Sequence, residues 1–184
     1  MIIVGLGNPG TEYEKTRHNT GRIVLEMFRK KNDLPEWQEN KKLKGLVSQK
    51  GKINLLLPET FMNKSGEAVA KIIKNKKTVK DLVVIHDDLD LPLGRFKISF
   101  NRGAGGHRGV LSIIKALKTE AFTRIRIGIA PKKKPSGKKA VIDFILGEFK
   151  PAELAALKKI TQKIVIAFPQ RKKESSFVPS VQIR

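Results

Sequence analysis

The strongest constraint on the fold is an alternation of strand-like and helix-like patterns along the whole chain. Strand patterns occupy residues 1–5, 53–57, 82–86, 95–100 and 124–130. Helix patterns occupy residues 19–31, 65–75, 108–118 and 151–168. This alternation is typical of an α/β fold. The first three strand patterns are continuous apolar runs, which predicts that they lie in the middle of the sheet.

The chain length and the absence of an interdomain linker indicate that residues 1–184 form a single domain. The chain has 184 residues, 40% of them hydrophobic, which is enough for a single sizeable core. No internal repeat and no linker rich in Ser or Pro interrupts it. We expect residues 175–184 to form a short, poorly ordered C-terminal tail.

Several classes of protein are excluded by what the sequence lacks. No run approaches 18 apolar residues, and no basic segment precedes the first apolar stretch, so neither a membrane span nor a secretory signal is expected. The chain contains no Cys, which excludes disulfides, thiolate catalysis and cysteine zinc sites. A cytoplasmic protein is expected.

The charge is strongly basic and unevenly distributed. The formal net charge is +21, and thirteen basic residues stand against one acidic residue between positions 91 and 142. A merely solvated surface is one interpretation, but blocks of like charge often mark an interaction surface. One Trp and one Tyr are too few for stacking many unpaired bases. The phosphates of a folded nucleic acid are the better partner.

The glycine-rich opening formally matches a dinucleotide-binding fingerprint. That fingerprint needs a helix starting inside the glycines and an acidic residue about 20 positions further on. Pro9 delays the next helix to about Asn19, and the sequence near position 30 is Phe-Arg-Lys-Lys. A chain reversal after a buried strand is therefore the favoured interpretation of these glycines.

The three His residues occur at loops or element ends rather than on apolar helix faces. Asn8 follows the first strand and Asp87 the third, so both can meet a loop residue such as His18 at one edge of the sheet. A His held by a carboxylate can remove a proton from water near neutral pH. Capping roles for Asp87 and Asn63 remain alternatives, as does a metal site, although no metal-ligand spacing is present. Without Cys or a nucleophile elbow, water is the expected nucleophile.

Five motifs together resemble the bacterial-type peptidyl-tRNA hydrolase family, over residues 1 to about 167. They are VGLGNPG at 4–10 with TRHN at 16–19, TFMNKSG at 60–66, HDDLDLP at 86–92, GGH at 105–107 and RIRIG at 124–128. The resemblance implies a mixed, mostly parallel twisted sheet flanked by helices. It also implies hydrolysis of the ester that joins a peptide to the terminal adenosine of tRNA, without metal or cofactor, by a monomer.

The resemblance also assigns roles to individual residues. His18 would activate water, supported by Asp87, while Asn8 and Asn63 would position the peptide and the water. Substrate-binding residues would be Tyr13, Phe61, Met62, His107 and Arg108. Residues meeting the acceptor stem and CCA end of the tRNA would be Lys97, Arg126, Lys132 and Lys133. The basic segment 131–150 corresponds to a mobile lid.

Arg108 departs from the family pattern, which usually has Asn after Gly-Gly-His. Asn both donates and accepts hydrogen bonds, whereas Arg only donates, so we expect Arg108 to meet a phosphate of the CCA end. A second hypothesis is an RNA-binding relative that has lost turnover, as in chloroplast splicing factors that resemble the family. The presence of Asn8, His18, Asn63 and Asp87 together favours the enzyme.

Overall fold

The computed structural model describes residues 1–73 and 75–167, and the predicted tail at 175–184 lies outside them. A seven-stranded mixed sheet in the order β2-β3-β4-β1-β5-β7-β6 forms its centre. The parallel strands are β1 (Ile2–Gly5), β4 (Ile53–Pro58), β5 (Leu82–Pro92) and β7 (Thr123–Ala130). The antiparallel additions are β2 (Gln38–Asn40), β3 (Gly45–Lys50) and β6 (Phe96–Phe100). The predicted sheet type is confirmed, and the three apolar runs are neighbours within it.

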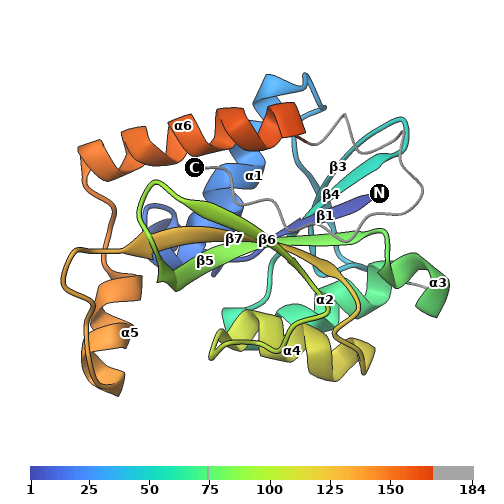
Figure 1. Ribbon diagram of the computed structural model, residues 1–184. Coiled ribbons are helices and arrows are strands. Elements are labelled where there is room, and N and C mark those ends of the chain that lie inside the picture. Colours follow the sequence, from blue (N-terminus) through green and yellow to red (C-terminus); the bar gives the residue numbers. More distant parts are fainter. Residues whose placement is uncertain (74, 168–184) are drawn as a thin grey trace.

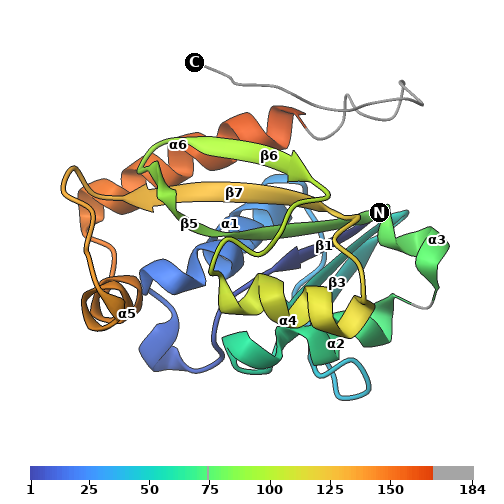
Figure 2. The same ribbon diagram turned by 60° about the horizontal axis from the view of Figure 1, so that its bottom comes forward.

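Helices cover both faces of the sheet (Figures 1 and 2). One face carries α1 (Thr20–Lys31) and α6 (Pro151–Ala167), whose apolar side chains pack with Ile3 and Ile85. The other carries α2 (Ser65–Ile72) and α4 (Arg108–Leu117), which pack on Val4 and Val84. Alternate residues of β1 and β5 thus enter two separate cores, as expected for strands buried on both faces.

Some elements differ from the predictions. The strands β2 and β3 and the helices α3 (Lys76–Val79) and α5 (Lys138–Leu146) were not predicted. α2 ends at Ile72 rather than at residue 75. β5 continues to Pro92 because its polar end still pairs with β7, with an irregularity between Asp88 and Pro92. The described part of the chain has no helix that is both long and apolar enough to cross a membrane.

A close approach between α1 and the central strands fixes where the polar loops meet. A Cβ on Gly21 would lie 2.3 Å from the Ile85 carbonyl oxygen, and one on Gly5 would lie 2.5 Å from the Gly21 oxygen. Only glycine permits backbones this near to each other. The contact brings the start of α1, and the 3-10 turn η2 (Arg17–Asn19) before it, against the carboxyl ends of β1 and β5.

Candidate active site

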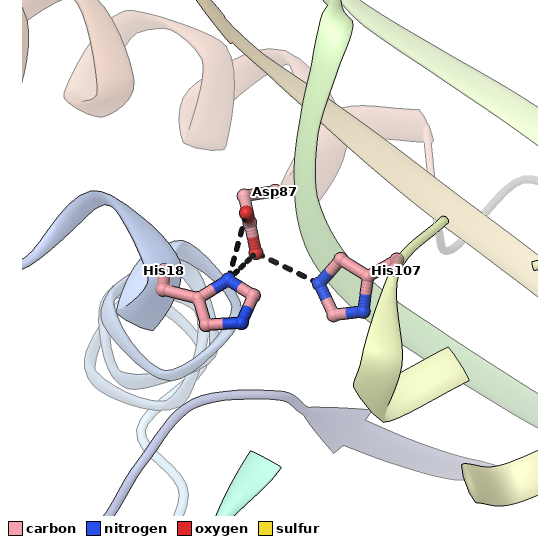
Figure 3. A group of neighbouring side chains, drawn as sticks. All are labelled: His18, Asp87 and His107. Atoms are coloured by element: carbon pink, nitrogen blue, oxygen red, sulfur yellow. Dashed lines mark hydrogen bonds and ion pairs between the residues drawn. The ribbon is translucent and has the colours of Figure 1, made fainter. Parts of the chain in front are cut away.

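Three polar side chains from distant segments converge at the carboxyl ends of the central strands (Figure 3). His18 comes from η2, Asp87 from the buried part of β5, and His107 from the N-cap of α4. Asp87 is only 4% exposed, and His18 is buried as well. An ionised carboxylate this deeply buried needs hydrogen-bond partners, which the two imidazoles supply.

The hydrogen bonds define which nitrogen of each imidazole carries a proton. His18 donates from Nδ1 to both Asp87 oxygens, at 2.9 and 3.1 Å, and its Nε2 has no hydrogen-bond partner among residues 1–73 and 75–167. His107 Nε2 donates to Asp87 Oδ1 at 2.9 Å, while its Nδ1 accepts from the Val110 N–H at 3.3 Å. His18 presents an unshared nitrogen, as a general base requires.

The charges around Asp87 control its protonation and that of His18. Burial alone would raise the pKa of Asp87, but the two imidazoles outweigh it and hold that pKa well below its usual range. Burial alone would likewise lower the pKa of His18, yet the charge and hydrogen bond of Asp87 raise it above the ordinary value of about 6.5. Arg108 opposes this rise. Asp87 therefore stays ionised, and it makes the imidazole of His18 more basic.

A third imidazole, His86, lies beside the group and is hydrogen-bonded to the backbone of Asp87 rather than to its carboxylate. Its Nδ1 donates to the Asp87 carbonyl oxygen at 2.6 Å, and its ring centroid lies 4.6 Å from that of His107. Burial, followed by the charge of His107, holds the pKa of His86 well below the ordinary value. His86 is therefore neutral and belongs to the floor of the site.

The loop after β1 holds a buried amide in a fixed orientation. Asn8 Oδ1 accepts from the Met62 N–H at 2.8 Å, so its Nδ2 points elsewhere and has no partner among residues 1–73 and 75–167. Asn19 fixes the same loop by accepting from the Asn8 N–H at 2.8 Å and donating to the Asn8 carbonyl at 2.9 Å. Asn8 Nδ2 is thus a free, oriented donor. Asn19 has no role in the sequence predictions, although it directly follows His18.

The other residues that the resemblance assigned to the substrate lie in different surroundings. Asn63, in the 3-10 turn η3 (Met62–Lys64), is exposed, and it does not cap α2. The Met62 side chain is buried in the core against Gly109 rather than lining an open surface. Phe61 is 56% exposed and lines a smaller hollow of about 440 Å³ beside β2 and β3. Tyr13, in η1 (Thr11–Tyr13), is half-buried.

A large cavity of about 870 Å³ opens beside the three imidazoles. Its floor is formed by β5 and β7, and its walls by the loop before α4 and by α5. His18, Asp87 and His107 lie at this cavity. Four other predicted site residues are not among its lining residues: Asn8, Tyr13, Met62 and Asn63. Its basic lining residues are Arg102, Arg108, Arg124, Arg126, Lys134 and Lys138. Such a lining suits an anionic substrate.

The predicted tRNA-binding residues are spread over the cavity and the neighbouring surface. Lys97 on β6 and Arg126 on β7 are directly opposite each other in the antiparallel pair, and therefore share one face of the sheet. Arg126 donates from Nε to Asp88 at 2.5 Å. Lys132 and Lys133 are exposed in the segment between β7 and α5. Arg124, which the sequence predictions left without a role, lies two residues before Arg126 in the cavity.

The imidazole and carboxylate group also has the composition of a metal site. One ligand atom from each of His18, Asp87 and His107 lies within 4.8 Å of the others. A cation there would have to replace the N–H hydrogen bonds that Asp87 accepts from both imidazoles. Those hydrogen bonds account for the convergence of the three side chains without an ion.

The fold and the site together define an α/β enzyme whose His–Asp pair opens into a basic cavity. The chain belongs to the peptidyl-tRNA hydrolase family, whose family model matches residues 2–178. A peptidyl-tRNA hydrolase of Thermodesulfovibrio yellowstonii is 43% identical over 179 residues, covering 89% of this chain and 86% of its own. One from Synechococcus sp. (strain JA-3-3Ab) is 40% identical over 172 residues, covering 91% and 75%.

Solved structures agree with this assignment. The crystal structure of peptidyl-tRNA hydrolase from Acinetobacter baumannii superposes with a TM-score of 0.83 at 31% sequence identity. The match covers 93% of this chain and 89% of the other. The family predicted from the five motifs is therefore confirmed by both sequence and fold.

Proposed function

We propose that this chain hydrolyses the ester bond between a peptide and the terminal adenosine of tRNA, with His18 as the base that activates water. The observation that carries the mechanism is the hydrogen bond from His18 Nδ1 to the buried Asp87 carboxylate, while Nε2 has no partner in the described part of the chain. An ester is already an activated acyl group. An oriented water, a base and one amide donor therefore suffice for the reaction.

The reaction proceeds in two steps, addition of water to the ester carbonyl and collapse of the intermediate. His18 Nε2 takes a proton from water while the water oxygen adds to the ester carbonyl, and the negative charge develops on the carbonyl oxygen. The free Nδ2 of Asn8 donates a hydrogen bond to that oxygen. The intermediate then collapses, the ribose oxygen leaves with the proton returned by His18, and a peptide acid and free tRNA are released. We assign Asn63 to the peptide, because it is exposed and directly follows Met62, whose N–H donates to Asn8.

Turnover distinguishes this function from that of an RNA-binding relative that has lost catalysis. The purified chain is incubated with a large excess of N-acetyl-aminoacyl-tRNA, and released N-acetyl-amino acid is counted. The enzyme releases many equivalents per chain. A chain that only binds RNA retains the substrate on a filter and releases none, and this outcome would overturn the proposal.

The tRNA body binds along the basic face through its phosphates, and this binding depends steeply on salt. Lys97→Ala or Arg126→Ala is expected to lower the slope of log affinity against log salt by about 0.7 to 0.9 for each contact removed. Fluorescence anisotropy with labelled tRNA at several salt concentrations measures the slope. Lys71→Ala, a change on the exposed surface of α2, is the matched control. Unchanged slopes in both variants would mean that the tRNA lies on another face.

Arg108 contacts a phosphate of the CCA end and also tunes the base. Arg108→Ala is expected to raise KM by about tenfold, the low end for a charge-assisted hydrogen bond because the side chain is exposed. Its charge lowers the pKa of His18, so its removal shifts the acid limb of the pH–rate profile to higher pH. Initial rates between pH 5 and 9 report both effects. A fall in kcat with KM and the limb unchanged would instead assign Arg108 to the oxyanion.

The segment 131–150, which includes α5, acts as a lid over the cavity in this proposal. α5 lines the cavity but has no fully buried residue, so little apolar packing holds it closed. The proposed enzyme works as a monomer in the cytoplasm, where translation produces its substrate, and uses no cofactor or metal.

A further inference from the structure

One charged side chain in the cavity has no role in the proposed mechanism and no partner in the described part of the chain. Arg124, on β7, is only 3% exposed. Its guanidinium makes no hydrogen bond or ion pair with any residue in 1–73 or 75–167. Arginine is rarely buried without a partner, because loss of hydration is costly unless an anion compensates for it. The guanidinium nitrogens of Arg124 are not among the fully enclosed atoms that lack a partner, so an anion in the cavity can reach them.

Charges of both signs surround Arg124: Arg126 and Arg102 repel its charge, whereas Asp88 and Glu120 attract it without an ion pair to it. Arg126 is two residues away on the same strand face, and Arg102 lies across the same cavity. The nearest carboxylate of β5, Asp88, is already engaged by Arg126 at 2.5 Å. Burial, and then the charge of Arg126, lowers the pKa of Arg124. An anion entering the cavity would meet a largely buried guanidinium that forms no ion pair with a carboxylate of residues 1–73 or 75–167.

We propose that Arg124 and Arg102 bind a phosphate of the 3′-terminal nucleotides of tRNA inside the cavity. This inference rests on the proposed function. The carboxyl group of the peptide is esterified in the substrate, so the anions that every substrate shares are the phosphates of the RNA. The planar guanidinium fork matches two phosphate oxygens.

The position of Arg124 identifies which phosphate is bound. It lines the same cavity as His18 and Asp87, which act on the ester of the terminal adenosine. A phosphate that reaches the buried Arg124 therefore belongs to the last few nucleotides, whereas the more exposed Arg126 of the same cavity can meet the tRNA body. Arg124 differs in this respect from Lys97, which is exposed at the edge strand β6. Contacts with a largely buried side chain are also less sensitive to salt than contacts on the surface.

Two short substrates test the assignment. One is N-acetyl-aminoacyl-adenosine, which has no phosphate, and the other carries the same ester on the trinucleotide CCA. Arg124→Gln is expected to lower kcat/KM for the trinucleotide ester by about 10- to 100-fold and to leave that for the adenosine ester unchanged. Lys115→Gln, on the exposed side of α4, is the control. Equal losses on both substrates, or a loss only with full-length tRNA, would overturn the proposal.

Thermal unfolding tests the subsite without relying on catalysis. An arginine that holds the fold together destabilises the protein when removed, whereas an unpartnered buried charge does not. Arg124→Met is therefore expected to melt no lower than the wild type. Inorganic phosphate, against chloride at equal ionic strength, raises the melting temperature of the wild type but not of Arg124→Met. A lower melting temperature of the variant, or an equal response to phosphate, contradicts the subsite even if the chain hydrolyses no ester.

Discussion

Replacing His18 by alanine is expected to lower kcat by about 10²- to 10⁴-fold, because the reaction loses the group that takes the proton from water. Affinity for tRNA stays nearly unchanged, since the basic residues that contact the phosphates remain in place. Single-turnover release of N-acetyl-amino acid measures the rate, and anisotropy measures binding. The loss should be present at every pH at which the wild type is active.

A second variant separates the base from the hydrogen bond. In His18→Asn the amide nitrogen occupies nearly the position of Nδ1 and can still donate to Asp87, but no counterpart of Nε2 remains. We expect His18→Asn to be as slow as His18→Ala while melting closer to the wild type. Near wild-type activity of His18→Asn would mean that the hydrogen bond, and not a base, is what the reaction needs.

Asp87→Asn is expected to cause a loss of similar size, about 10²- to 10⁴-fold, for a reason that the hydrogen bonds specify. Asp87 accepts N–H groups from both His18 and His107. An asparagine has only one acceptor oxygen, so its NH₂ group would face an imidazole N–H. His18 would relieve this clash by moving its proton to Nε2, which removes the base.

The double variant tests whether the two residues act on one step. Asp87→Asn added to His18→Ala should cost almost nothing further, because the base that Asp87 orients is already absent. Any residual activity of Asp87→Asn should also have its acid limb at lower pH, because the carboxylate raises the pKa of His18. If the rate losses of the two single variants add fully in the double variant, and the acid limb of Asp87→Asn does not move, Asp87 has a separate role.

The middle of the sheet was predictable because burial on both faces gives continuous apolar runs, as in Leu82–Ile85 of β5. The strands at the edges of the sheet and the peripheral helix α5 were harder to predict. β3 mixes apolar and polar residues, and α5 has no fully buried residue, so neither carries a clear periodic pattern. The end of β5 was missed because Asp87–Pro92 contains three Asp residues and a Pro, which interrupt the apolar run, and it still pairs with β7.

In the site, the pairing of His18 with Asp87 was foreseeable from their places at strand ends and loops. The contact of His107 with Asp87 was not, because it depends on how the loop before α4 folds back over the sheet. The isolation of Arg124 could not be predicted either. In the sequence, Arg124 and Arg126 alternate with Ile125 and Ile127, which indicates that the Arg side chains lie on a solvent-facing side of the strand. Arg124 is nevertheless buried, in a cavity that the loop before α4 also lines.

The pH dependence of hydrolysis with and without His18 tests the central claim most directly. Single-turnover rates on N-acetyl-aminoacyl-tRNA are measured from pH 5 to 9 for the wild type and for His18→Ala. The wild-type rate should rise with pH through one ionisation above about 6.5, because Nε2 acts only when His18 is neutral and Asp87 raises its pKa. His18→Ala should lack both this ionisation and most of the rate. A wild-type rate independent of pH, or an unchanged profile in His18→Ala, would contradict water activation by His18.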